Sequence, residues 1–257
     1  EKKGDEYIGE LCFGHLLTSS NYNDKEERLV GGRNGFGAGL TNIWSKEFLL
    51  ETVWIHPENG NAQQYKQKWS NNMKNKGKPK IKDDKRKNGY TKVSFVPDYE
   101  RFGIQTSFFP TFESLLLRRL CDMAATTMLN VKYNKKKINL KQGRGMSSLA
   151  GYGCLIGNTT NVTHTVLGER WECVVLTKPD VEEWPPIPSF VNGVRCDEKG
   201  PFCEVAEEKF IAALREKVKK QTKVELKKSE IMKHVGVVVN ALIKNPRFSS
   251  QTKDKCT

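Results

Sequence analysis

The sequence predicts an α/β fold, with helices and strands in an α+β arrangement, and three observations lead to this class. Apolar residues recur at spacings of three and four residues in several segments, which is the period of an amphipathic helix. Other segments are runs of aromatic and β-branched residues bounded by turn or charged residues, which is typical of strands. In the second half of the 257-residue chain, two strand-like runs, a helical pattern and a further strand follow one another, which predicts a strand, helix, strand unit.

Helices and an antiparallel sheet are expected in the first half of the chain. Apolar spacing predicts a helix that ends near Thr18, and a second helix that carries Leu40, Ile43 and Trp44 after a cluster of glycines. A third helix with an apolar stripe over 112–124 is expected to pack on the sheet. The expected strands are 47–55, 65–69, 90–96 and 131–134.

A connection between two domains is expected between Leu140 and Thr163, where Gly, Ser, Asn and Thr are frequent and no clear periodicity is present. We place the boundary near Gly145, which gives expected domains of 1–145 and 146–257. The elements expected beyond it are strands at 170–176 and 189–194, a helix over 205–218, a second helical stretch and a strand at 235–243.

The chain is strongly basic, with 43 Lys and Arg against 30 Asp and Glu and a formal charge of +13. This excess favours acidic partners such as nucleic acid or nucleotides. Part of it lies in 74–88, for which a solvated loop, a DNA-backbone contact and a nuclear-localisation signal remain alternatives. Apolar runs are too short to cross a bilayer, so we expect no membrane partner.

The seven cysteines are scattered and never occur as a CxxC pair, which predicts reduced thiols in an intracellular protein and neither a zinc site nor a disulfide framework. The first residues, EKKGDEYIGE, have no initiator Met and no signal-peptide order of basic and then apolar residues. We therefore expect the chain to be a segment of a longer protein.

The glycine-rich segment over 31–40 is the candidate for phosphate binding. Glycines at Gly32, Gly35 and Gly37 permit positive φ and let backbone N–H groups approach phosphate oxygens closely. A helix that begins there adds the positive end of its dipole. The lysine of the GxxxxGK[ST] motif is missing, so the spacing alone does not distinguish a phosphate loop from an ordinary glycine-rich turn.

Longer sequence segments carry a resemblance to a known family. LCFGHLLTSSNYND and GGRNGFGAGLTNIWSKEF, followed in order by GERWECVVLT, SFVN and VVVNALIKNPRFSSQTKDK, resemble the ATPase region of eukaryotic-type type IIA DNA topoisomerases over almost the whole chain. The resemblance implies a Bergerat-type GHKL ATP-binding sandwich in 1–145, without its N-terminal part. It implies a transducer domain with a ribosomal-protein-S5-like fold in 146–257, truncated at its C-terminus.

The resemblance also implies an ATP site with Mg²⁺. In the family, a Ser-Ser-Asn triplet touches the sugar and phosphates, a glycine-rich loop cradles the triphosphate, and a Gln-Thr-Lys loop reaches the terminal phosphate. Gly39 stands where family members usually have a lysine, which implies weakened ATP binding. The matching residues are Ser19, Ser20, Asn21, Gly32, Arg33, Asn34, Gly35, Phe36, Gly37, Ala38, Gly39, Gln251, Thr252 and Lys253.

No catalytic or metal-binding residue is assigned within this chain. The family's general-base glutamate and magnesium-holding asparagine precede the matching segment, and its DNA-cleaving tyrosine follows it. Glu6 and Glu10 align after the missing motif and are interpreted as helix-terminal or surface charges. We therefore expect no hydrolysis by this chain alone.

For the complete protein the resemblance implies an isomerase that changes DNA topology by ATP-dependent double-strand breakage, passage and rejoining. It implies a homodimer that acts on double-stranded DNA in the nucleus during chromosome segregation. The alternatives are a divergent nonhydrolysing ATP- or DNA-binding module, another Bergerat ATPase, and a DNA-binding protein without a nucleotide requirement. The region over 180–205 departs from the family, and a lineage-specific loop, a damaged gene copy and an imperfect gene model remain open.

Overall fold

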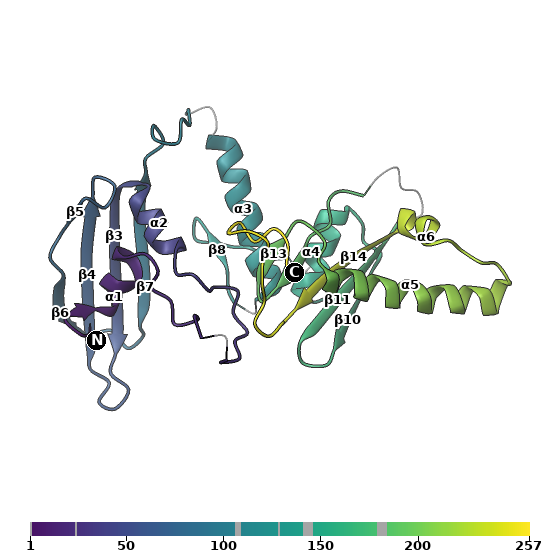
Figure 1. Cartoon of the computed structure of the whole chain (residues 1–257), viewed down its shortest axis with the longest axis horizontal. Coiled ribbons are helices and arrows are strands. Elements are labelled where there is room, and N and C mark those ends of the chain that lie inside the picture. The colour runs from purple at the N-terminus through teal and green to yellow at the C-terminus, as the bar shows by residue number, and fades with distance from the viewer. Residues whose placement is uncertain (1, 24, 106–108, 128, 141–145, 179–183) are drawn as a thin grey trace. The chain divides into compact units, whose positions relative to one another are not determined.

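The computed structural model describes residues 2–23, 25–105, 109–127, 129–140, 146–178 and 184–257. The chain forms two compact units, shown in Figure 1. Unit 1 comprises 1–24 and 32–109, and unit 2 comprises 25–31 and 110–257. Both contain helices and strands, which confirms the predicted α/β class. Within the described ranges, no helix combines the length and apolar character needed to cross a membrane.

An antiparallel sheet forms the centre of unit 1 and confirms the three strands predicted between residues 47 and 96. Its longest strand, β3 (Ser45–Ile55), pairs with β4 on one side and with β7 on the other. The strand order is β5-β4-β3-β7, and β6 also pairs with β4. The remaining strands are β4 (Ala62–Ser70), β5 (Asn75–Lys76), β6 (Lys80–Asp84) and β7 (Tyr90–Pro97).

The charged segment over 74–88 is not simply a solvated loop, because it contributes β5 and β6 to the sheet. The backbone of β6 pairs with β4, with Ile81 opposite Tyr65. Strands at a sheet edge need few apolar side chains, and charged ones there oppose pairing with other molecules. The loop interpretation is therefore wrong for these strands, whereas a DNA contact and a localisation signal stay predictions.

Two short helices, α1 (Ile8–Gly14) and α2 (Gly37–Ile43), accompany the sheet of unit 1, and a short hairpin of β1 (Lys2–Lys3) and β2 (Glu6–Tyr7) precedes α1. The first helix ends four residues before the predicted Thr18, and the second begins inside the glycine segment as predicted. A Cβ built on Gly14 would lie 3.1 Å from the Trp69 ring, so this glycine lets α1 approach the sheet closely. The core of unit 1 consists of Phe48, Leu50, Tyr65 and Trp69.

Unit 2 is built on a five-stranded sheet with the order β10-β11-β14-β12-β13. Its pairs are antiparallel except that β12 runs parallel to β14, and α5 and α6 lie between these two strands in the chain. The predicted strand at 189–194 is two strands joined by Asn192 and Gly193, both at positive φ, as a two-residue hairpin requires. The strands are β10 (Val162–Leu167), β11 (Trp171–Thr177), β12 (Ser189–Val191), β13 (Val194–Cys196) and β14 (Val235–Ala241).

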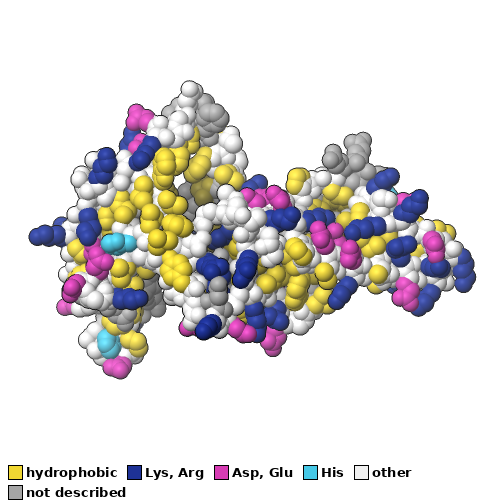
Figure 2. Space-filling view, viewed as in Figure 1, with side chains coloured by type: hydrophobic (Ala, Val, Ile, Leu, Met, Phe, Trp, Pro, Cys, Tyr) yellow, Lys and Arg dark blue, Asp and Glu magenta, His cyan; other side chains and the backbone are white. Residues whose placement is uncertain are grey.

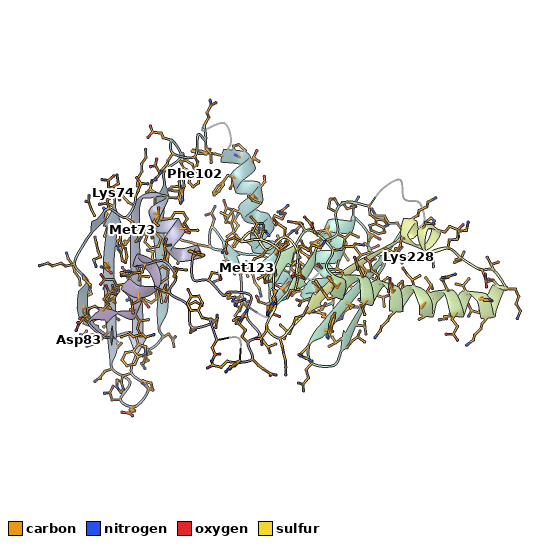
Figure 3. All side chains as sticks on the ribbon, in the orientation of Figure 1. Met73, Lys74, Asp83, Phe102, Met123 and Lys228 are labelled. Carbon is orange, nitrogen blue, oxygen red and sulfur yellow. The ribbon has the colours of Figure 1, made fainter. Side chains whose placement is uncertain are left out.

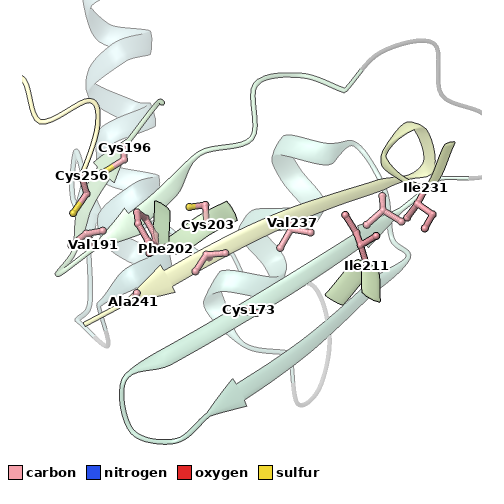
Figure 4. Packing of buried hydrophobic residues seen from close by; sticks show 12 residues of the cluster. Cys173, Val191, Cys196, Phe202, Cys203, Ile211, Ile231, Val237, Ala241 and Cys256 are labelled. Atoms are coloured by element: carbon pink, nitrogen blue, oxygen red, sulfur yellow. The ribbon is translucent and has the colours of Figure 1, made fainter. Parts of the chain in front are cut away.

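Helices cover both faces of the unit 2 sheet. Val237 and Val239 of β14 pack with α5 (Pro201–Thr222) and α6 (Lys228–His234), in the cluster shown in Figure 4. Val238 points to the other face and packs with α3 (Phe109–Thr126) and α4 (Ser148–Gly157). Successive side chains of β14 thus enter two different cores. Unit 2 therefore has three layers, with α5 and α6 on one face of the sheet and α3 and α4 on the other.

Helix α3 packs in unit 2 with only part of the stripe that was predicted to pack on the first sheet. Its buried residues are Asp122, Ala124 and Ala125, and the two alanines belong to the unit 2 core. The side chain of Met123, labelled in Figure 3, is 46% exposed. The other stripe residues that are exposed are Phe112, Leu115 and Leu116. The predicted packing is therefore wrong, because the C-terminal half of α3 is buried in unit 2.

The division between the compact units falls after Phe109, whereas the sequence predicts a domain boundary near Gly145. Residues 141–145 lie outside the described residues, and the domain ranges 1–145 and 146–257 stay a prediction. The strand predicted at 131–134 is part of a hairpin of β8 (Lys132–Tyr133) and β9 (Lys136–Lys137). Both α4 and the start of β10 fall within the expected connection.

Candidate functional site

Two segments that the sequence singles out, Ser19–Asn21 and the glycine segment, lie against each other in unit 1. The Asn21 side-chain amide donates a hydrogen bond to the Gly32 carbonyl oxygen at 2.9 Å. The Tyr22 hydroxyl donates to the Asn34 carbonyl oxygen at 2.9 Å. Ser19 Oγ accepts from the backbone N–H of Asn21 at 3.0 Å, which shapes the triplet. The structure therefore brings together residues that are eleven or more positions apart.

Gly35 lies against the backbone of Thr18, the residue that precedes the Ser19–Asn21 segment. Its φ is +66°, in the left-handed region that favours glycine. A Cβ built there would lie 2.7 Å from the carbonyl carbon and 2.8 Å from the nitrogen of Thr18, both backbone atoms that cannot move aside cheaply. Two independent restrictions thus require glycine at this position.

The glycine segment also presents open backbone at the start of α2, whose N-cap is Phe36. Gly32 and Gly37 are exposed, and no heavy atom lies within 4 Å of a Cβ built on either. The N–H groups of the first helical turn have no acceptor within the helix. Open space beside unoccupied backbone donors fits an anionic group such as a phosphate. Arg33 and Ala38 are half-buried, whereas Ser20 is exposed.

Gly39 lies at the opposite side of α2 and is buried. A Cβ built on it would lie 2.7 Å from the His15 carbonyl oxygen and 2.8 Å from Leu16 Cδ2. The backbone that leaves α1 therefore occupies the space that any side chain at position 39 would enter. A lysine at this position requires α1 and α2 to move apart.

A cavity of about 280 Å³ lies between α1 and the sheet of unit 1. Apolar side chains dominate its wall, and the hydroxyls of Thr52 and Thr91 and the amides of Gln63 and Gln64 add polar groups. Such a mixture is typical of pockets that hold a small planar ligand. The sequence did not predict this cavity, because its wall comes from α1 and five strands and no single segment carries a pattern for it.

Glu6, Glu10 and His15 form a cluster whose ligand atoms lie within 4.8 Å of one another, a geometry compatible with a metal ion. A cation is already present, since Lys76 Nζ lies 2.5 Å from Glu10 Oε1 and this hydrogen bond raises the lysine pKa. His15 Nε2 lies 3.2 Å from Glu6 Oε1. Glu10 is only 6% exposed. Glu10 lies in the first turn of α1, as a helix-terminal charge does, but it is buried and not at the surface, and the absence of a general base stays a prediction.

The Gln251–Lys253 segment lies in a loop of unit 2. Lys253 adopts a φ of 63°, and its Nζ lies 5.9 Å from the centre of the Phe248 ring, within cation–π range. An antiparallel backbone β-bridge between Phe248 and Cys256 closes the loop, and the Ser249 backbone N–H donates to the Lys255 carbonyl oxygen at 3.0 Å. Gln251 and Thr252 are exposed. A nucleotide contact by these three residues stays a prediction. The nucleotide contacts predicted for Ser19–Asn21 and for the glycine segment of unit 1 also stay predictions.

The chain is similar to known proteins over its whole length. A family model described as DNA gyrase B matches residues 164–257. DNA topoisomerase 2 of Meyerozyma guilliermondii is 37% identical over 274 residues, which cover 100% of this chain and 19% of that protein. The chain therefore spans less than a fifth of that relative's length.

Two solved structures resemble the fold closely. The ATPase region of Saccharomyces cerevisiae topoisomerase II has a TM-score of 0.79 and 34% identity, with 100% of this chain and 64% of that one covered. The ATPase and transducer domains of DNA topoisomerase II from Balamuthia mandrillaris give a TM-score of 0.78 and 34% identity, with 98% and 62% covered. Sequence and fold comparisons thus point to the same part of the same kind of protein.

Proposed function

Since this chain belongs to the eukaryotic-type family of type IIA DNA topoisomerases, we propose that it is the nucleotide-binding and transducer part of an ATP-dependent topoisomerase. The observation that carries the nucleotide role is that Ser19–Asn21 lies against the glycine segment: the Asn21 amide donates to the Gly32 carbonyl oxygen, and Gly35 lies against the backbone of Thr18, the residue before the triplet. There, hydroxyl and amide groups and open backbone N–H groups converge on one edge of unit 1. These are the groups that bind sugar hydroxyls and phosphates.

The cavity beside α1 is the proposed site of the base. It borders Cys12 and Phe13 near the end of the helix, and the chain continues from there directly into Ser19–Asn21. An apolar wall with a few hydroxyls and amides suits a purine ring, which needs both stacking area and polar contacts. Bound ATP supplies a triphosphate whose charge the backbone donors of the glycine segment stabilise. Lys253 is proposed to contact the same nucleotide.

The complete protein is proposed to act on double-stranded DNA as a nuclear homodimer, with Mg²⁺ bound alongside ATP. The surface charge supports a DNA partner, because Lys and Arg side chains are exposed along much of unit 2 around α5 and α6 in Figure 2. ATP-dependent separation of interlinked DNA circles by the complete protein is the activity that tests this proposal. A complete protein that relaxes or separates DNA equally well without ATP contradicts it.

By itself, the chain is proposed to bind nucleotide without hydrolysing it. The specific observation is that Glu6 and Glu10, the acidic residues of the segment before and within α1, are engaged by His15 and Lys76. A general base must hold the attacking water within hydrogen-bond reach, and these carboxylates are directed to other partners. Release of inorganic phosphate from ATP by the purified chain would contradict this part of the proposal.

Calorimetric titration with a nonhydrolysable ATP analogue and Mg²⁺ tests nucleotide binding directly. Gly35→Ala is expected to abolish measurable binding, because the added Cβ meets the Thr18 backbone and strains a φ of +66°. Gly60→Ala is the matched control, since Gly60 has a φ of +71° in the turn after β3 and nothing within 4 Å of its Cβ. The control carries similar backbone strain away from the site and is expected to bind like the parent chain. Equal binding by both variants, or no binding by the parent chain, defeats the proposal.

A further inference from the structure

The segment over 25–31, here called the strap, connects the two parts of the proposed nucleotide site. It follows Ser19–Asn21 and precedes Gly32, so each of its ends continues into a nucleotide-binding segment of unit 1. The contacts of the strap itself nevertheless place it in unit 2. A movement of either nucleotide-binding segment is therefore transmitted along the chain to a segment anchored in the other unit.

Arg28 anchors the strap to the chain after β14. Its backbone N–H donates to Asn245 Oδ1 at 3.0 Å, and the Asn245 N–H donates back to the Arg28 carbonyl oxygen at 2.9 Å. The guanidinium reaches the Pro246 carbonyl oxygen at 3.5 Å, and the residue is only 9% exposed. One backbone bond and one bond to the Asn245 side chain thus hold a buried residue, which fixes the position of the strap more firmly than a surface ion pair does.

The contacts of the strap lead on to the Gln251–Lys253 loop. A Cβ built on Gly31 would lie 2.5 Å from Val194 Cγ2, so the strap is tightly seated against β13. Phe248 Cζ lies 3.9 Å from the same built position, and the ammonium of Lys253 lies 5.9 Å from the centre of the Phe248 ring. Phe248 therefore lies near both the strap and the loop that carries Lys253.

We propose that the strap is a second connection between nucleotide site and transducer, in which Arg28 and Asn245 are positioning residues that transmit changes independently of Lys253. This inference rests on the proposed function. Nucleotide binding that orders Ser19–Asn21 and the glycine segment restricts both ends of the strap. The restriction reaches 244–248 through the Arg28–Asn245 bonds and needs no direct contact between Lys253 and the nucleotide.

Two substitutions at Asn245 separate the hydrogen bond from the backbone conformation. Asn245 has a φ of 48°. Asn245→Gly removes the Oδ1 acceptor and tolerates the left-handed φ, whereas Asn245→Asp retains an acceptor at the same place. Lys253→Ala removes the other connection and leaves the strap unchanged.

Hydrogen exchange of the chain with and without the nonhydrolysable ATP analogue and Mg²⁺ tests the proposal. The analogue is expected to slow exchange in 19–39 and in 244–248. Asn245→Gly is expected to reduce the slowing at 244–248 by about fivefold or more while 19–39 still responds, and Asn245→Asp to retain it. In Lys253→Ala, the response at 244–248 is expected to persist. An unchanged response in Asn245→Gly, or its complete loss in Lys253→Ala, overturns the proposal.

A comparison without nucleotide distinguishes failure of the strap from failure of the proposed function. Gly35→Ala disturbs the glycine segment directly. Without nucleotide, the Gly35→Ala single variant is expected to exchange faster at 244–248 than the parent chain does. The Gly35→Ala, Asn245→Gly double variant is expected to exchange there at the same rate as Asn245→Gly alone. If the analogue does not bind at all, the proposed function falls, and this comparison alone decides on the strap. An exchange rate at 244–248 that is the same in the Gly35→Ala single variant as in the parent chain overturns the strap proposal.

Discussion

Replacement of Gly39 by alanine tests the close approach of α1 and α2 beside the proposed nucleotide site. The new Cβ meets the His15 carbonyl oxygen at 2.7 Å, a backbone atom. Overpacking of this kind costs about 1 to 3 kcal/mol. Alanine in place of glycine inside a helix returns about 1 kcal/mol, so the net effect is a loss of up to about 2 kcal/mol.

Gly37→Ala is the matched control, because it lies in the same short helix and nothing is within 4 Å of its Cβ. The helix-propensity gain and the change in the unfolded chain are similar for both variants, so their difference isolates the contact with His15. That difference is expected to be about 1 to 3 kcal/mol, which for a protein of this size shifts the melting temperature by roughly 2 to 4 °C per kcal/mol. Calorimetric melting of the three proteins measures it, and a Gly39→Ala variant as stable as Gly37→Ala refutes the reasoning.

The same contact predicts the outcome of restoring the family residue. Gly39→Lys introduces the positive charge that family members place near the phosphates, but its Cβ meets the same carbonyl oxygen. We expect this variant to be as destabilised as Gly39→Ala and to bind the ATP analogue no more tightly than the parent chain does. A gain in affinity without loss of stability contradicts the geometry of α2.

Two further predictions concern unit 2. Asp122 is buried and accepts hydrogen bonds from Tyr152 at 2.6 Å and from Arg195 at 3.1 Å, so Arg195→Met, which leaves the aspartate without its buried cation, is expected to cost about 3 to 5 kcal/mol in chemical denaturation. An unchanged denaturation midpoint would show that Asp122 is not buried as described. Burial raises the pKa of the Cys203 thiol to about 11 from an ordinary 9.0, so its stabilising effect is complete below pH 9 and lost as the pH rises through 11. Denaturation midpoints are expected to fall less over this range in Cys203→Ala, and at pH 8 iodoacetamide is expected to modify exposed Cys12 before buried Cys203.

The sequence predicted best those strands that are rich in aromatic and β-branched residues. Runs of aromatic and β-branched residues bounded by turn or charged residues located β3 and β4 to within a few positions, and buried residues of these strands such as Phe48, Leu50, Tyr65 and Trp69 form the core of unit 1. Helix α4 was missed because it is buried on most sides and consists largely of small residues, including Gly151 and Gly153, so it has no polar face to give a helical period.

Helix α3 shows a different reason for failure. The apolar period over 112–124 correctly indicated a helix, but periodicity does not specify which neighbour a helix meets. Asp122 is buried on the side that packs, because Arg195 and Tyr152, which are 73 and 30 residues away in sequence, neutralise and hydrogen-bond its carboxylate. Only long-range partners make such burial favourable, and a local pattern contains no information about them.

The candidate site combines both kinds of information. Residue types carried over from the family located the Ser19–Asn21 and glycine segments, and the structure brings these together. Carried-over residue types say nothing of the space around a position, however, and at Gly39 that space is occupied by the His15 backbone. Glycine at this position thus goes together with a close approach of α1 and α2, so we expect that restoring the lysine alone does not restore its contact. If this chain binds ATP, the affinity must come from the backbone donors, the triplet and the cavity beside α1, and the Gly35→Ala titration measures the first of these directly.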